Sequence, residues 1–97
     1  MNAHDPDRAR LVSAVQAIEA LYPLRVLGRL PRGAAVHVFG EDALDLLAKK
    51  REGLSLLTLA GAEVDLAERL GRPVGIVLTS ELHGQEAIRL TEAVRPL

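Results

Sequence analysis

Three arginines near the middle of the chain are the first side chains whose spacing suggests chemistry. Arg25, Arg29 and Arg32 follow one another in a stretch of alternating apolar and polar residues. If this stretch is a strand, Arg25 and Arg29 lie on the same face of it, because side chains alternate along a strand. A rim of guanidinium groups suits a phosphate or the acidic surface of a partner. A solvated sheet edge without a ligand is the alternative interpretation.

The histidines give a weaker indication of a site. His4, His37 and His83 are far apart, and none has a second histidine at the i, i+4 spacing that is typical of metal ligands on a helix. His37 lies between Val36 and Val38 and is expected on the wetter face of a strand. The sequence contains no cysteine, which excludes a thiolate nucleophile and a cysteine-ligated zinc.

Acidic residues at 41–45 could face one another only under one assignment of local structure. On a helix, Asp42 and Asp45 share a face at i, i+3, whereas on a strand Asp42 points away from Asp45. Local signals favour a short helix over 41–53 that ends at Gly53, but residues 43–48 are equally acceptable as a buried strand. A single carboxylate binds a divalent ion weakly, because such ions need several oxygen ligands.

Composition narrows the class of protein. The chain has 97 residues, of which 48% are hydrophobic, and a net charge of −1, which suits one globular domain over 1–97. The absence of a basic excess argues against autonomous binding of nucleic acid. The polar N-terminus and the lack of a long apolar run predict neither a secretory signal nor a membrane span. With no cysteine, the cytoplasm is the expected location.

The spacing of apolar residues, together with the residues that start and stop helices, predicts an alternation of helices and strands. Ser55 before an apolar periodic segment and Gly71 after it predict a helix over 55–70, the clearest of these elements. Pro23 is expected to end the first helix. The remaining expected elements are a helix from about 5 to 22, strands over 24–30, 34–39 and 74–79, and a helix over 85–94.

The second half of the chain resembles the minimal nucleotidyltransferases of the DNA polymerase β superfamily. The resemblance rests on the order and spacing of short pieces, none of which is specific alone. These pieces are Ala43-Leu44-Asp45-Leu46-Leu47, Leu54-Ser55-Leu56-Leu57, Leu70-Gly71-Arg72-Pro73, the strand 74–79, and Leu90-Thr91-Glu92-Ala93-Val94. The resemblance implies an α/β (α+β) fold, a small mixed sheet flanked by helices, with Asp45 and Gly75 on adjacent strands.

At the positions where the resemblance implies metal ligands, this sequence departs from the family. The first acid of the family's Asp-x-Asp pair falls on Ala43, the second is kept as Asp45, and the third falls on Gly75. Asp45 is therefore the one expected metal ligand, as a vestige of the family's two-metal site.

The family's phosphate-binding turn can be placed in two ways. Gly40 with Glu41 would put an acid where the phosphate sits. The preferred placement is Gly28 with Arg29, extended by Arg32 and Gly33, although the family's serine is missing. Under this placement, residues 34 to 40 replace the helix that follows the turn in the family.

These departures favour a catalytically inactive domain with no catalytic residue and no cofactor. The resemblance implies a binding or regulatory module. Such a module pairs with a small helical protein, for example as the antitoxin of a toxin–antitoxin couple, or with a second copy of itself. The alternative is an active nucleotidyltransferase that uses Mg²⁺ and a nucleotide with displaced acids: Asp42, Asp45 and Asp65.

Overall fold

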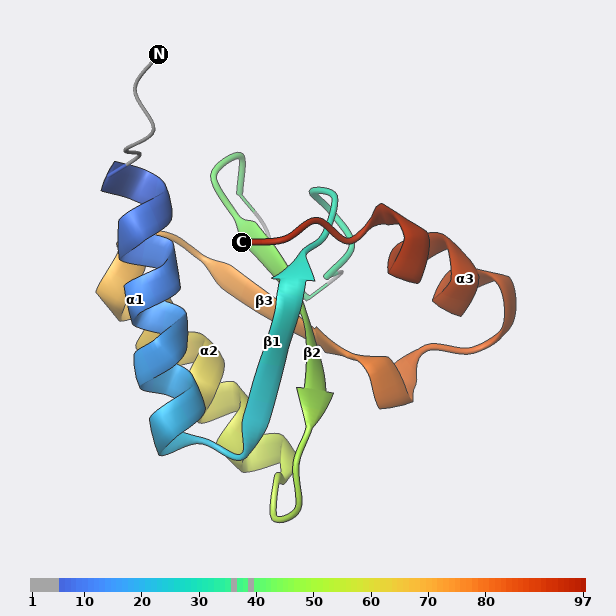
Figure 1. Ribbon diagram of the computed structural model, residues 1–97, viewed down its shortest axis with the longest axis horizontal. Coiled ribbons are helices and arrows are strands. Elements are labelled where there is room, and N and C mark those ends of the chain that lie inside the picture. Colours follow the sequence, from blue (N-terminus) through green and yellow to red (C-terminus); the bar gives the residue numbers. More distant parts are fainter. Residues whose placement is uncertain (1–5, 36, 39) are drawn as a thin grey trace.

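A computed structural model describes residues 6–35, 37–38 and 40–97 of the chain (Figure 1). The order of helices and strands is α1 (Pro6–Leu21), β1 (Leu24–Arg29), β2 (Leu44–Lys50), α2 (Leu56–Leu70), β3 (Val74–Leu78), the short 3-10 helix η1 (Thr79–Glu81) and α3 (Gly84–Ala93). The strands form one sheet in the order β1-β2-β3. β1 runs antiparallel to β2, and β2 runs parallel to β3. The sheet is therefore mixed, as the family resemblance implies.

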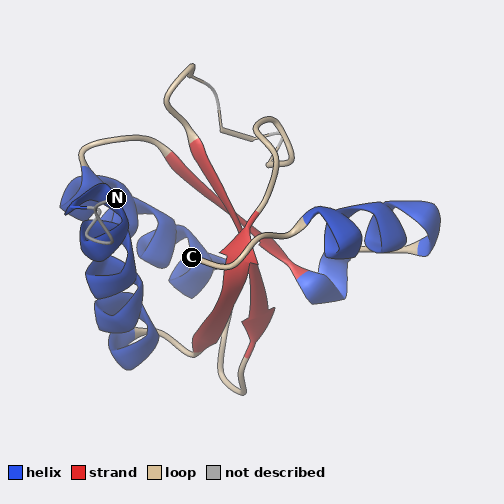
Figure 2. Ribbon diagram, turned by 45° about the horizontal axis from the view of Figure 1, so that its top comes forward, coloured by secondary structure: helices blue, strands red, loops and turns tan. Residues whose placement is uncertain are grey.

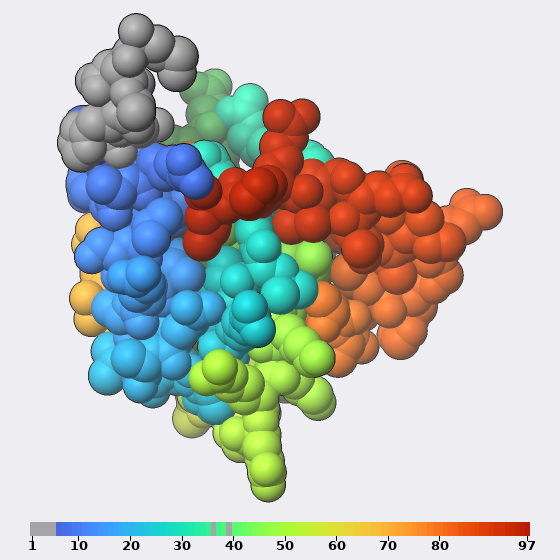
Figure 3. Space-filling view, viewed as in Figure 1, coloured from blue at the N-terminus to red at the C-terminus, as the bar shows by residue number. Residues whose placement is uncertain are grey.

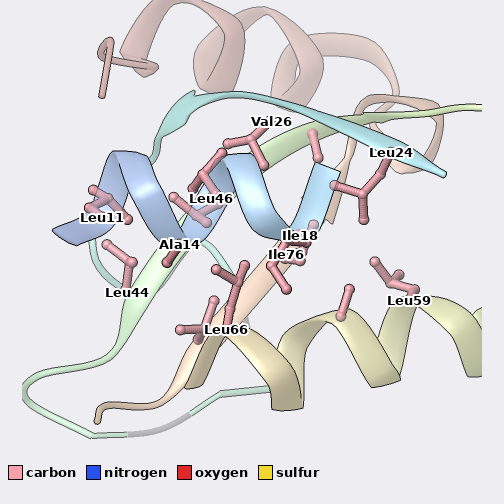
Figure 4. Close-up of a cluster of buried hydrophobic side chains, with 14 of the residues drawn as sticks. Leu11, Ala14, Ile18, Leu24, Val26, Leu44, Leu46, Leu59, Leu66 and Ile76 are labelled. Carbon is pink, nitrogen blue, oxygen red and sulfur yellow. The ribbon is translucent and has the colours of Figure 1, made fainter. Parts of the chain in front are cut away.

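One face of the sheet carries the hydrophobic core. Helices α1 and α2 lie on this face, while η1 and α3 lie on the other side (Figure 2). Ile18 of α1, Leu66 of α2, and Leu46 and Ile76 of the sheet meet between these layers and are at most 1% exposed (Figure 4). Burial of such aliphatic side chains is worth roughly 1.5–3 kcal/mol each. We call this side of the sheet the helix face.

Helix α2 begins and ends where its local sequence predicts. The Ser55 side chain accepts a hydrogen bond from the backbone N–H of Thr58, which caps the first turn. Gly71 ends the helix in the left-handed conformation, with φ of 68°, and its N–H donates to the carbonyl of Ala67. Helix α1 ends at Leu21, just before Pro23, also as predicted.

The segment with two possible assignments is strand β2. It is the central strand of the sheet, and Leu44 to Ala48 are all buried. Its backbone is paired on both sides, so the sheet as a whole selects the strand over the helix. The strand predicted over 34–39 is wrong for the described residues there. Ala34, Ala35 and His37 lie in turns and bends and Val38 has no regular structure, while positions 36 and 39 lie outside the described residues.

A β-bulge in β1 redirects one of the arginines. The register of β1 against β2 shifts between Val26 and Gly28, so Leu27 is the extra residue. Arg29 is consequently opposite Leu46 on the helix face, whereas Arg25 is opposite Lys49 on the other face. The expectation that Arg25 and Arg29 share a face is therefore wrong, because a one-residue shift reverses the direction of every later side chain.

Acidic side chains cap outward-facing amides at both edges of the sheet. The N–H of Val26 in β1 donates to Glu19 at 2.9 Å. In β3, the N–H of Ile76 donates to Glu63 at 2.7 Å, and that of Leu78 donates to Glu81 at 3.1 Å. Capped edges of this kind do not offer a template for a further strand.

The C-terminal segment folds back over β1. Arg95 forms an antiparallel bridge with Arg29, with N–H···O distances of 2.7 and 2.9 Å, and Arg8 Nε donates to a main-chain oxygen of Leu97, the last residue, at 2.7 Å. This segment accordingly lies between α1 and the end of β1 (Figure 3).

Helices spanning a bilayer are not found in the described part of the chain, where no helix has the necessary length and apolar character.

Candidate functional site

Asp45 and Gly75 occupy directly paired positions on the two parallel strands of the sheet. They are Cα partners in the register of β2 with β3. Because Leu44 and Leu46 belong to the core on the helix face, the Asp45 side chain between them lies on the opposite face. The adjacency that the sequence resemblance implies is thus confirmed.

The carboxylate of Asp45 is buried and holds the loop that joins β1 to β2. Its Oδ2 accepts hydrogen bonds from the backbone N–H groups of Gly33 at 2.7 Å and Ala34 at 3.1 Å. The residue is 2% exposed, and its Oδ1 has no hydrogen-bond partner among the described residues. Hydrogen bonds to a charged acceptor are worth more than neutral ones, about 1.5–3 kcal/mol each. Asp45 therefore acts as an anchor for this loop.

The same loop fills the space in front of Gly75. A Cβ atom built on Gly75 would lie 2.5 Å from the Cβ of Ala35 and 2.9 Å from a methyl group of Val38. Ala35 is 1% exposed, so its methyl group is part of the protein interior. An acidic side chain at position 75 would have to displace this loop.

The residues predicted to form a phosphate-binding turn are distributed over different surroundings. Gly28 lies within β1 under the C-terminal segment, where an added Cβ would lie 2.3 Å from the carbonyl oxygen of Arg95. Arg29 follows it on the helix face. Arg32 donates from Nη1 to the backbone carbonyl of Glu41, and Gly33 donates to Asp45. Of the four, Gly33 is the one that touches Asp45, and the phosphate turn stays a prediction.

The displaced acids of the alternative hypothesis are also separated. Asp65 lies on α2, where it accepts hydrogen bonds from the Tyr22 hydroxyl at 3.2 Å and from Arg69 Nε at 2.7 Å. Partial burial raises the pKa of Tyr22 above its ordinary value, and the negative charge of Asp65 raises it further. Asp42 lies in the turn before β2, where its backbone carbonyl accepts from Arg72 Nε at 2.5 Å.

One acidic residue at the loop was missed by the sequence interpretation. Glu63 of α2 accepts hydrogen bonds through Oε2 from Ile76 N–H and, at 2.7 Å, from Nε2 of His37. This contact joins the β1–β2 loop to α2 and to the edge of β3. No local signal in the sequence could have paired His37 with Glu63, because they are separated along the chain and meet only through the packing of α2.

The donor set around Asp45 does not fit the two-metal centre that the fold implies. Two divalent ions need several oxygen ligands directed into one space. The paired position carries Gly75, position 43 is Ala43, and Oδ2 of Asp45 is engaged by two N–H groups. No cluster of three or more His, Cys, Asp or Glu side chains with metal-binding geometry occurs within residues 6–35, 37–38 and 40–97.

The fold and the Asp45–Gly75 pairing define a small nucleotidyltransferase-like α+β domain. A solved structure of a protein described as a candidate minimal nucleotidyltransferase aligns with a TM-score of 0.69 and 26% sequence identity. The alignment covers 99% of this chain and 100% of the other. No protein-family model matches the chain, and no curated protein sequence matches it. The chain therefore has the minimal nucleotidyltransferase fold.

Proposed function

We propose that this domain has lost nucleotidyl transfer and acts as a binding or regulatory module for a protein partner. The observation that carries the proposal is the loop at the Asp45–Gly75 pair. Its N–H groups engage Asp45, and the side chains of Ala35 and Val38 occupy the space that a third carboxylate would need. A site that binds a triphosphate and two metals requires that space to be open and acidic.

A groove along α2 supports the choice of a protein partner. Leu57 and Val64 are 84% and 57% exposed, and they line a hollow of about 540 Å³ with Tyr22 and Gly61. The Leu57 and Val64 positions are seven residues apart on one side of α2, a spacing that suits a second helix. Because acidic side chains cap amides at both sheet edges, addition of a strand is the less favourable mode of association. The partner is a second copy of the chain or a small helical protein, as for an antitoxin, and the cytoplasm is the proposed location.

The alternative function is a nucleotidyltransferase that uses Mg²⁺, a nucleotide and displaced acids. Oδ1 of Asp45 favours it, because a buried carboxylate oxygen with no donor among the described residues is a potential ligand. Against it, Asp65 is engaged by Tyr22 and Arg69 in the helix layer, whereas Asp45 lies on the other side of the sheet.

Two measurements test the proposal. In the first, the protein is mixed with Mg²⁺ or Mn²⁺ and each nucleoside triphosphate, and both pyrophosphate release and the amide resonance of Asp45 are followed. We expect neither release nor a saturable shift. Metal-dependent release that is abolished in Asp45→Asn would overturn the loss of catalysis.

The second measurement addresses the partner. Sedimentation velocity over a concentration series tests self-association of the wild-type chain and of the Leu57→Lys/Val64→Lys variant. A matched control is Leu56→Lys, since Leu56 is 81% exposed and lies outside the groove. We expect the double variant, but not the control, to weaken association. The partner model is wrong if two results are obtained together. The wild type stays monomeric, and the double variant crosslinks to an identified helical protein as well as the wild type does.

A further inference from the structure

A second hollow, on the helix face, gathers three arginines from different parts of the chain. Arg8 comes from the first turns of α1, Arg29 from the end of β1, and Arg72 from the connection between α2 and β3. The hollow has a volume of about 290 Å³, near the lower end of the range for small-molecule pockets, which begins at roughly 300 Å³. Because Asp45 lies on the other face, this hollow is separate from the nucleotidyltransferase-like position.

The β-bulge brings Arg29 to this place. In a regular strand, with Leu27 paired like its neighbours, Arg29 would share the face of Arg25 and point away from α1. In the structure it lies opposite Leu46 on the helix face and lines the hollow. None of the described residues provides the Arg29 guanidinium with a hydrogen bond or an ion pair.

The other two arginines are held by bonds to main-chain oxygens. Arg8 Nε donates to Leu97 O at 2.7 Å, and Arg72 Nε donates to Asp42 O at 2.5 Å. Each of these bonds uses Nε and limits the orientation of the guanidinium plane. A preorganised guanidinium loses less freedom when it binds an anion than a mobile one does.

The lining as a whole combines positive charge with apolar walls. It contains three arginines, one acid, Asp7, and the last residue, Leu97, whose terminal carboxylate is a second negative group, so these charges sum to +1 (three positive less two negative). Leu11, Leu44 and Leu70 supply apolar surface next to these charges. This positive excess favours an anion, and several planar guanidinium groups can each bind a pair of phosphate oxygens, whereas a carboxylate offers only one such pair.

From this arrangement, we propose that the hollow between α1, the end of β1 and the C-terminal segment binds a small phosphate-bearing molecule with an apolar part. Nucleic acid is the less suitable ligand, because the chain carries 12 basic and 13 acidic residues and the arginines gather around one hollow instead of forming an extended stripe. The proposal does not depend on the loss of catalysis or on the partner groove. The proposed phosphate site and the proposed function can therefore fail independently.

The test is an NMR titration of the full chain at constant ionic strength. The probes are inorganic phosphate, phenyl phosphate and acetate. We expect saturable shifts of the amides of Arg29 and Arg72 with both phosphates, tighter binding of phenyl phosphate, and at least about fivefold weaker binding of acetate. Shifts that never saturate, or equal affinity for acetate and phosphate, would overturn the proposal.

Substitutions locate the site. Loss of one hydrogen-bonded charge costs about tenfold in affinity, so we expect Arg29→Gln and Arg72→Gln each to weaken phenyl phosphate binding by about that factor. The matched control is Arg25→Gln, on the same strand but on the opposite face, which should bind like the wild type. An equal loss in Arg25→Gln, or no loss in both Arg29→Gln and Arg72→Gln, would contradict the assignment.

Discussion

Asp45 and Gly75 are paired across β2 and β3, and the loop between β1 and β2 lies against both of them. The pairing keeps the relative position of two residues that would carry metal carboxylates in an active nucleotidyltransferase. The loop supplies backbone N–H groups to one of them and methyl groups to the other. The backbone arrangement is therefore retained at this point, while the chemical groups that face one another differ from the carboxylates of an active nucleotidyltransferase.

Replacement of Gly75 tests the close contact with the loop. We expect Gly75→Ala to lower the free energy of unfolding by about 1–3 kcal/mol, because the new Cβ would lie 2.5 Å from that of Ala35. The double variant Gly75→Ala/Ala35→Gly should recover part of this loss, with a coupling of about 0.5–3 kcal/mol. Urea denaturation of the four proteins in the cycle measures both quantities.

A matched control for this cycle exists in α2. At Gly61 an added Cβ would lie 3.5 Å from Cε1 of Tyr22, an ordinary contact. Gly61→Ala should therefore leave the stability unchanged or raise it by up to about 1 kcal/mol through helix propensity. Strict additivity of Gly75→Ala and Ala35→Gly would show that the loop does not rest on Gly75.

Substitution of Asp45 tests its role as a loop anchor. Asp45→Ala removes the acceptor of the Gly33 and Ala34 amides, and we expect these two amides to exchange with solvent faster by at least about tenfold. The expected loss of stability is about 1–3 kcal/mol, less than the sum of the two hydrogen bonds, because Gly33 is exposed and its amide can bind water instead. Asp45→Asn keeps an acceptor oxygen and should lie between wild type and Asp45→Ala. Unchanged exchange at both amides in Asp45→Ala would refute the anchor.

The hydroxyl of Tyr22 provides a pH-dependent probe of the α1–α2 contact. Partial burial, followed by the charge and hydrogen bond of Asp65, raises its pKa in the folded protein. The folded state therefore holds the phenolic proton more tightly than the unfolded state does. This contribution to stability is complete below pH about 10 and is lost as the pH rises through the folded pKa.

Absorbance of the phenolate measures this directly, because the chain has one tyrosine and no tryptophan. We expect the titration midpoint to lie above the ordinary value in the native protein and to return to it in urea. Asp65→Asn should lower the midpoint only in part, since burial remains. In Tyr22→Phe, the extra loss of stability above pH about 10 should disappear. A native midpoint equal to that in urea would contradict this account.

Local signals predicted most of the elements because the physical cause of each lies within a few residues. Ser55 and Gly71 mark the two ends of α2 through hydrogen bonds of the helix itself. The apolar run at 74–78 is a strand buried in the sheet. The error at 34–38 has the opposite origin. Alternating valines favour a strand, but Ala35 and Val38 pack against Gly75, and His37 contacts Glu63, instead of pairing with a neighbouring strand.

The sequence by itself determined the boundaries of α2, the apolar faces that form the core, and the absence of acids at positions 43 and 75, since these depend on residue type and short-range spacing. Only the tertiary structure decided that β2 is a strand, because pairing with both neighbours outweighs a weak local preference. The tertiary structure also decided that Asp45 anchors a loop and that the bulge at Leu27 turns Arg29 toward Arg8 and Arg72. These relations join residues far apart in the chain, so they depend on register and packing and leave no local pattern.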